Sequence, residues 1–144
     1  MNDAAGTKLH ELIEQARDVD GIDAVMVLDR DGLTLAASAA DEIDTESLSA
    51  TAANGLLLAD ALGAELGQLG DATQTTIEYA GGTILLTPLD EDLALLILAH
   101  TGANLGRLRL LARRSRGDLL TAAQEYVMLP GAVSQQQMAA SGVA

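Results

Sequence analysis

Apolar side chains recur with a helical period in three segments of the chain. In residues 7–18, four of them follow the spacing i, i+3, i+4 and i+7, which is one face of a helix. Residues 44–69 and 104–126 carry longer patterns of the same kind. Each segment begins at a residue suited to capping a helix: Thr7, Asp44 or Thr45, and Asn104. We therefore expect three helices.

Short apolar or alternating runs occupy the stretches between these helices. They cover residues 22–29, 33–38, 73–79, 83–88 and 93–99, and turns rich in Gly, Asp or Pro separate neighbouring runs. Tight turns join antiparallel strands, so the order α-β-β-α-β-β-β-α predicts a mostly antiparallel sheet covered by helices. The continuous apolar run 93–99 is typical of a central strand, and the polar alternation of 73–79 is typical of an edge strand.

The helix predicted near 45–69 has two apolar rows, whereas a surface helix normally has one. We expect the first row to pack on the sheet; it consists of Leu48, Ala52, Gly55, Ala59, Leu62 and Leu66. The opposite row consists of Ala50, Ala53, Leu57, Ala61 and Ala64. The high helix propensity of alanine explains four positions of this second row, but it does not explain Leu57.

We therefore expect a second copy of the chain to cover the second row. An exposed edge strand invites pairing with its own copy, so a two-fold axis would bring both features into one homodimer interface. The residues expected in this interface are Ala50, Ala53, Leu57, Ala61, Ala64, Thr75, Ile77 and Tyr79.

Composition narrows the function classes. The net charge of −13 argues against a general nucleic-acid binder, because phosphate neutralisation supplies most of that affinity. The chain has no cysteine, which excludes disulfides and thiolate chemistry. It has neither a run of about eighteen apolar residues nor a signal-like start, so we expect a soluble cytoplasmic protein. We expect one domain at 1–126 and a flexible or loosely docked tail at 127–144.

Basic residues are concentrated in one segment. Five of the eight lie at Arg107, Arg109, Arg113, Arg114 and Arg116, with no acid among residues 107–116. Two readings remain open: a solvated helix face, or a surface for an acidic partner.

Several sequence features suggest chemistry without meeting its requirements. The stretch DRDG (29–32) begins like a calcium loop, but Leu33 and Ala40 occupy ligand positions 5 and 12, so we expect a hairpin turn. His10 and His100 have no triad partners at a known spacing. The segment HTGANLGR (100–107) lacks the spacing and the Lys-Ser/Thr of a Walker loop. We expect no catalytic, cofactor or metal site, and nucleotide sensing is a minor hypothesis.

Three stretches together resemble the roadblock (dynein light chain) family. They are DGIDAVMVLDRDGLTLA (20–36), AGGTILLTP (80–88) and ANLGRLR (103–109), and the resemblance extends over residues 7–118. It implies an α+β fold of three α/β/α layers, with a five-stranded antiparallel sheet, the central helix on one face and the two terminal helices on the other. It also implies a homodimer with edge-to-edge sheets and adjacent central helices.

The resemblance is to prokaryotic, MglB-like members, regulators of motility and polarity that are partners of small Ras-like GTPases. Some stimulate GTP hydrolysis by remodelling the GTPase instead of donating an arginine. The first functional hypothesis is therefore a non-enzymatic homodimer that binds such a GTPase. The alternative is a structural adaptor that uses the arginine-rich helix to bind an acidic partner. The residues expected to contact partners are Thr51, Asn54, Leu58, Glu65, Arg109 and Arg113.

Overall fold

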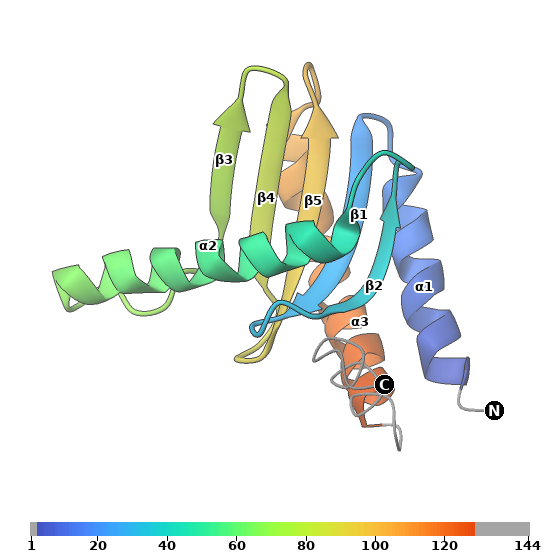
Figure 1. Cartoon of the computed structure of the whole chain (residues 1–144), viewed down its shortest axis with the longest axis horizontal. Coiled ribbons are helices and arrows are strands. Elements are labelled where there is room, and N and C mark those ends of the chain that lie inside the picture. The colour runs from blue at the N-terminus through green and yellow to red at the C-terminus, as the bar shows by residue number, and fades with distance from the viewer. Residues whose placement is uncertain (1–2, 129–144) are drawn as a thin grey trace.

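The computed structural model describes residues 3–128 as three helices and five strands (Figure 1). In chain order they are α1 (Asp3–Arg17), β1 (Ile22–Asp29), β2 (Thr34–Ala39), α2 (Thr45–Leu66), β3 (Thr75–Tyr79), β4 (Gly82–Pro88), β5 (Leu93–His100) and α3 (Leu105–Val127). Within residues 3–128, no helix is long and apolar enough to cross a membrane.

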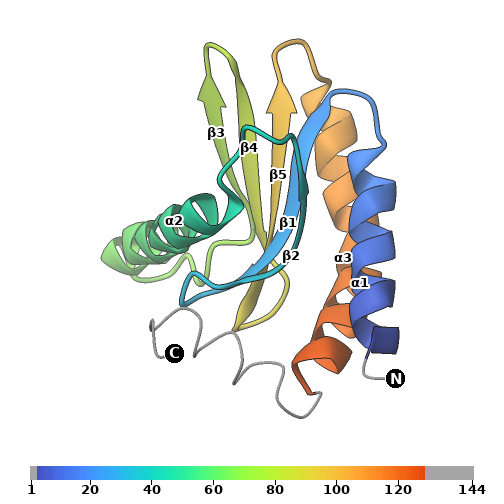
Figure 2. The same cartoon turned by 45° about the vertical axis from the view of Figure 1, so that its right-hand side comes forward.

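The five strands form one antiparallel sheet in the order β2-β1-β5-β4-β3. Helix α2 lies on one face, and α1 and α3 lie side by side on the other (Figures 1 and 2). The three-layer α/β/α fold and its element order are therefore confirmed. The central position expected for the run 93–99 is confirmed by β5, and the edge position expected for 73–79 is confirmed by β3.

Each face of the sheet has its own apolar core, because successive strand residues point to opposite faces. In β5, Leu95 and Ile97 pack with α1 and α3, whereas Ala94 and Leu96 pack beneath α2. The core under α1 and α3 is the larger one. It includes long aliphatic side chains from both helices, whereas α2 contributes Ala52 and Leu56 to its core, with Leu48 packed against it.

The DRDG segment is the hairpin turn between β1 and β2, as expected. The Asp29 carboxylate accepts hydrogen bonds from the backbone N–H groups of Asp31 (2.9 Å) and Leu33 (3.0 Å). Gly32 has a φ of +94°, which a side chain would strain, and a Cβ there would lie 3.0 Å from the Cα of Ala50. The carboxylate oxygen that would have begun a calcium loop is thus used to hold the turn.

Three helix boundaries differ from the prediction. Helix α2 ends at Leu66, not at residue 69, with Gly67 as a left-handed C-cap. Helix α1 begins at Asp3, so Thr7 lies inside it and is not its N-cap. The apolar period begins only at Leu9, and the preceding alanines extend the helix through their propensity, without that pattern. Helix α3 ends at Val127 with Met128 as C-cap, so the rest of the predicted tail lies outside the described residues.

Candidate interaction surface

Helix α2 is longer than the sheet that it crosses. Its 22 residues span about 33 Å at 1.5 Å per residue. Five strands spaced about 4.8 Å apart give a sheet only about 19 Å wide. The helix starts over β1 and β2, passes β4 and continues beyond the edge at β3 (Figure 1). Its second half therefore projects away from its own domain.

The row of α2 that faces the sheet agrees with the predicted one only in the first half of the helix. Ala52 is buried, Leu48 packs against the core beneath α2, and a Cβ at Gly55 would lie 3.4 Å from the Leu86 side chain. The buried residues are Ser49, Ala52 and Leu56, and their centre is rotated by roughly 70° from that of the predicted row if each residue turns the helix by about 100°. The Ser49 hydroxyl is fully buried and shares a 2.6 Å hydrogen bond with the hydroxyl of Thr34 on β2. A count of apolar positions missed Ser49 because a small polar group can be buried once its hydrogen bond is satisfied.

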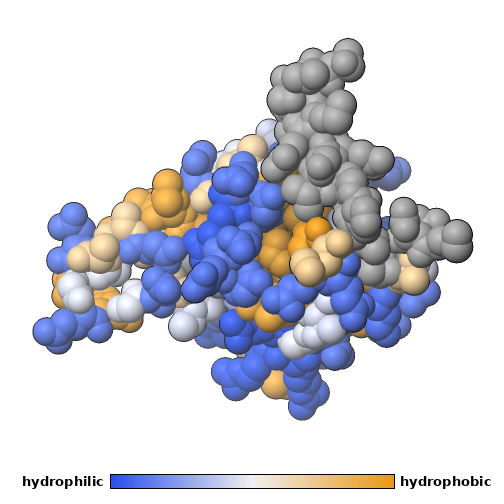
Figure 3. Space-filling model, turned by 90° about the horizontal axis from the view of Figure 1, so that it is seen from below, coloured by the Kyte–Doolittle hydropathy of each residue, from blue (hydrophilic) through white to orange (hydrophobic). Residues whose placement is uncertain are grey.

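The projecting half of α2 exposes leucines that its own domain does not cover. Leu62 and Leu66 are 61% and 68% exposed, so the expectation that they pack on the sheet is wrong. With Leu58 they follow a spacing of four residues along one side of the helix, and Leu57 is exposed beside them. We call these four residues the α2 leucine face. Figure 3 shows hydrophobic residues along the projecting arm of the molecule.

Strand β3 presents apolar side chains on the same side of the sheet as α2. Ile77 pairs with Ile84 and Thr75 pairs with Leu86, and both partners pack in the core beneath α2. Paired residues point to the same face, so the side chains of Thr75, Ile77 and Tyr79 face the α2 side. Within residues 3–128, β3 pairs with β4 alone, which leaves its other edge without a strand.

The residues predicted for a homodimer interface lie on this side of the molecule with differing exposure. Ala50, Ala61 and Ala64 are exposed on α2, and Ala53 is half-buried. Those predicted to contact a partner from α2 are all exposed and follow one line along the helix: Thr51, Asn54, Leu58 and Glu65.

One carboxylate ties the projecting helix back to the domain. Asp60 accepts a hydrogen bond from the Arg30 guanidinium at 2.9 Å and another from the Ala72 backbone N–H at 3.1 Å. These two contacts link the middle of α2 to the β1–β2 turn and to the segment that leads into β3. Both side chains of the ion pair are only about 30% exposed or less. Asp60 therefore fixes the direction in which the leucine face projects.

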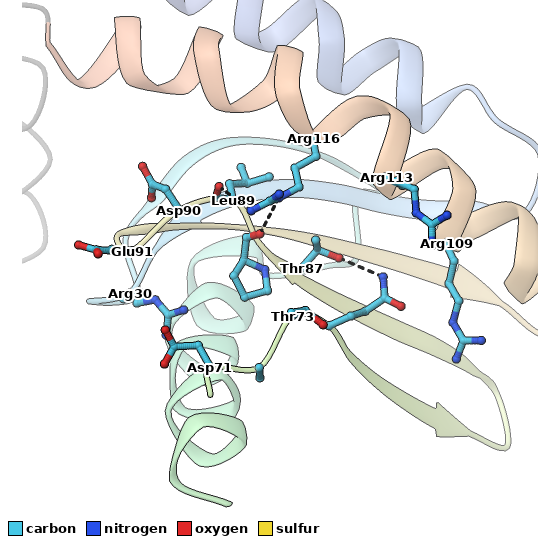
Figure 4. A pocket seen from close by; sticks show the side chains of 13 residues that line it. Arg30, Asp71, Thr73, Thr87, Leu89, Asp90, Glu91, Arg109, Arg113 and Arg116 are labelled. Carbon is cyan, nitrogen blue, oxygen red and sulfur yellow. Dashed lines mark hydrogen bonds between the residues drawn. The ribbon is translucent and has the colours of Figure 1, made fainter. Parts of the chain in front are cut away.

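A second surface feature is a groove of about 720 Å³ beside α3. Arg109, Arg113 and Arg116 line one wall (Figure 4). Arg116 donates to the backbone carbonyls of Pro88 and Leu89, at 3.2 Å each. Arg109 and Arg113 make no hydrogen bond or ion pair with any residue of 3–128. Within the described part of the chain, Arg116 is thus engaged with backbone carbonyls, whereas Arg109 and Arg113 have no partner.

The remaining polar candidates contact other residues of the domain. His100 contacts the Asp23 carboxylate at 3.2 Å, and His10 contacts Glu14 one helical turn away at 3.5 Å. Asn104 is the N-cap of α3, as predicted, because its side chain accepts from the Arg107 N–H. In the described part of the chain, no group of three or more His, Asp or Glu residues is arranged to hold a metal ion.

Comparison with known proteins identifies the family of this chain. A model of the Roadblock/LC7 domain matches residues 8–99, a span that leaves out the ANLGRLR motif. The uncharacterized protein MJ0310 of Methanocaldococcus jannaschii is 29% identical over 107 residues, which are 74% of this chain and 92% of that protein.

Two solved structures share the fold. Myxococcus xanthus MglB aligns with a TM-score of 0.76 at 18% identity, over 86% of this chain and 93% of that one. A structure described as MglB with a tetrameric arrangement aligns with a TM-score of 0.79 at 20% identity, over 85% of this chain and 93% of that one. Since the family model covers more than half of the 144 residues and the architecture agrees, the chain belongs to the Roadblock/LC7 domain family.

Proposed function

We propose that this chain is a non-enzymatic regulatory module that forms a homodimer through α2 and β3 and binds a small Ras-like GTPase. The observation that carries the self-association is the α2 leucine face, whose four leucines are 61–69% exposed. A contiguous apolar patch on a soluble protein usually marks an interaction site. This patch projects on a helix arm that its own domain cannot reach.

A second copy is the occupant that fits best. In a two-fold dimer each copy offers the same patch, so one contact covers both leucine faces and both β3 edges. The exposed Ile77 and Tyr79 extend the apolar area from α2 onto β3. The tetrameric arrangement named for an MglB of the same fold is self-association in that protein, and it supports this proposal for the present chain.

The GTPase part of the proposal rests on the family and on the polar residues of α2 that border the leucine face. The resemblance to MglB-like regulators suggests a Ras-like GTPase as partner. Thr51, Asn54 and Glu65 are exposed on a line of α2 that is nearly opposite the sheet-facing row. These polar residues would lie at the rim of a helix layer made by two adjacent α2 helices. One GTPase could then contact both copies.

The test uses the purified full chain and a Ras-like GTPase from the same organism, loaded with GDP or with a GTP analogue. We expect the two proteins to co-elute in one nucleotide state and the rate of phosphate release from GTP to change. Asn54→Arg should abolish co-elution, while sedimentation still reports the dimer. If no Ras-like GTPase of the organism co-elutes or changes its rate, the GTPase assignment is wrong, although self-association could still hold.

A further inference from the structure

The arginine groove runs from α3 to Arg30 and Ala72 near α2, and none of the four leucines of the α2 leucine face lines it. Gln74 and Thr87 form part of its floor. Leu85 pairs with Thr76 and packs in the core under α1 and α3. Thr87 follows Leu85 by two residues and Gln74 precedes Thr76 by two residues, so both side chains point to the α3 side. The groove is therefore complete within one copy. None of the side chains proposed for the dimer interface lines it, so a separate ligand can be argued for it.

We propose that this groove binds an extended acidic segment of a partner protein, with two carboxylates on alternate residues contacting Arg109 and Arg113. These two arginines are exposed and have no partner within residues 3–128. Five arginines within ten residues create a local positive field on a chain whose net charge is −13. Such a field attracts carboxylates and selects against basic partners.

The spacing of the arginines favours an extended ligand. Residues four apart on a helix rise about 6 Å along its axis. Alternate residues of an extended strand are about 6.7 Å apart and point to the same side. A segment with acids at positions i and i+2 therefore presents two carboxylates at nearly the separation of Arg109 and Arg113. Adjacent acids would point to opposite sides, and only one could reach the wall.

The opposite end of the groove limits the length of the acidic run. Asp90 and Glu91 lie at the end near Arg116, and Asp71 lines the groove beside Arg30 (Figure 4). The Asp90 carboxylate is held by its own turn and by Gln124, at 3.2 Å from the side-chain nitrogen. These carboxylates repel a ligand that is acidic throughout. We infer a short acidic stretch, followed by neutral or basic residues.

The distribution of charge also argues against two other occupants. A single phosphate would need cations that converge on one point, whereas Arg109 and Arg113 are spread along the helix and Arg116 is engaged with backbone carbonyls. The second alternative is the end of this chain, residues 129–144. That segment contains no Asp or Glu side chain to match the arginines.

The test is an NMR titration of the isotope-labelled full chain at low ionic strength. The probe is the capped peptide Gly-Ser-Glu-Ser-Glu-Ser-Gly, and its isomer Gly-Ser-Glu-Glu-Ser-Ser-Gly is the control ligand. We expect shift changes at Gln74 and at the side chains of Arg109 and Arg113. We expect the isomer to bind at least about fivefold more weakly, because only one of its acids reaches the wall.

Charge reversal supplies the matched protein control. The double variant Arg109→Glu/Arg113→Glu should weaken probe binding by at least about tenfold, since two exposed ion pairs are lost and replaced by repulsion. Arg107→Glu/Arg114→Glu makes the same charge change on the same helix outside this groove and should change the affinity by less than about twofold.

Four results would overturn the inference. They are equal binding of the two peptides, equal losses in the two double variants, the same shift changes with inorganic phosphate alone, and no shift change at millimolar probe. Each can be read whether or not the chain dimerises, because the groove is formed by one copy.

Discussion

Leu62 tests the proposed dimer with the least risk to the fold. Its side chain is 61% exposed, so shortening it to alanine removes little packing inside its own domain. Surface substitutions of this kind usually change the free energy of unfolding by about 0.5 kcal/mol or less. If a second copy covers the leucine face, however, Leu62→Ala removes apolar contact from both halves of the interface at once.

The expected loss follows from the exposed fraction. Full burial of a leucine side chain is worth about 2 kcal/mol, so covering the 61% still exposed gives about 1.2 kcal/mol per copy. Two copies give about 2.4 kcal/mol, and the methyl group that alanine keeps lowers this to about 2 kcal/mol. The dissociation constant of the dimer should then rise by about 30-fold.

Sedimentation velocity over a dilution series measures this constant for the 14.8 kDa chain. Leu110→Ala is the matched control, because Leu110 is 41% exposed on α3, on the other side of the sheet. We expect the control to leave the constant within about twofold of the wild type. Equal constants for Leu62→Ala, Leu110→Ala and the wild type would refute the assignment of the leucine face to the interface.

Further predictions concern the supports of the projecting helix, each measured by urea unfolding. Asp60→Ala should lower the free energy of unfolding by about 1–2 kcal/mol, because its ion pair and its backbone contact are lost. The control Asp31→Ala should change the free energy of unfolding by less than about 0.5 kcal/mol. Equal effects of the two substitutions would contradict the role of Asp60. Gly32→Ala should destabilise the protein by about 1–3 kcal/mol. The control Gly117→Ala lies at an open helical position and should stabilise the protein by about 0.5–1 kcal/mol. The same sign for both substitutions would be inconsistent with the turn geometry. Ser49→Ala should cost about 1–2 kcal/mol because it removes the hydrogen bond between the fully buried Ser49 hydroxyl and Thr34, and a neutral result would disprove that link.

The sequence predicted the fold well because period, turn residues and caps agreed with one another. Asp44 and Asn104 cap α2 and α3 as expected, and the turn at Gly32 has the expected geometry. These features are local, so they can be read from neighbouring residues. The family resemblance added how the helices divide between the two faces of the sheet.

The candidate site was predicted less well, because it depends on the relation between elements. Apolar spacing alone assigned Leu62 and Leu66 to the sheet, whereas the structure buries Ser49 and engages Asp60. One signal in the sequence pointed to the error: a helix of that length exceeds the width of a five-stranded sheet. No such signal showed that Arg116 binds backbone carbonyls while Arg109 and Arg113 do not. The carbonyls that Arg116 contacts lie 27 and 28 residues away in the chain.

The central claim is that the α2 helices of two copies lie side by side, and spin labels measure this directly. The chain has no cysteine, so Glu65→Cys on α2 and Lys8→Cys on α1 each carry a single label. Both positions are exposed, and dipolar coupling between labels requires two associated copies. The account predicts coupling for both variants, with a shorter distance between the Glu65→Cys labels than between the Lys8→Cys labels. Absence of coupling at micromolar protein, or a shorter distance between the α1 labels, would contradict it.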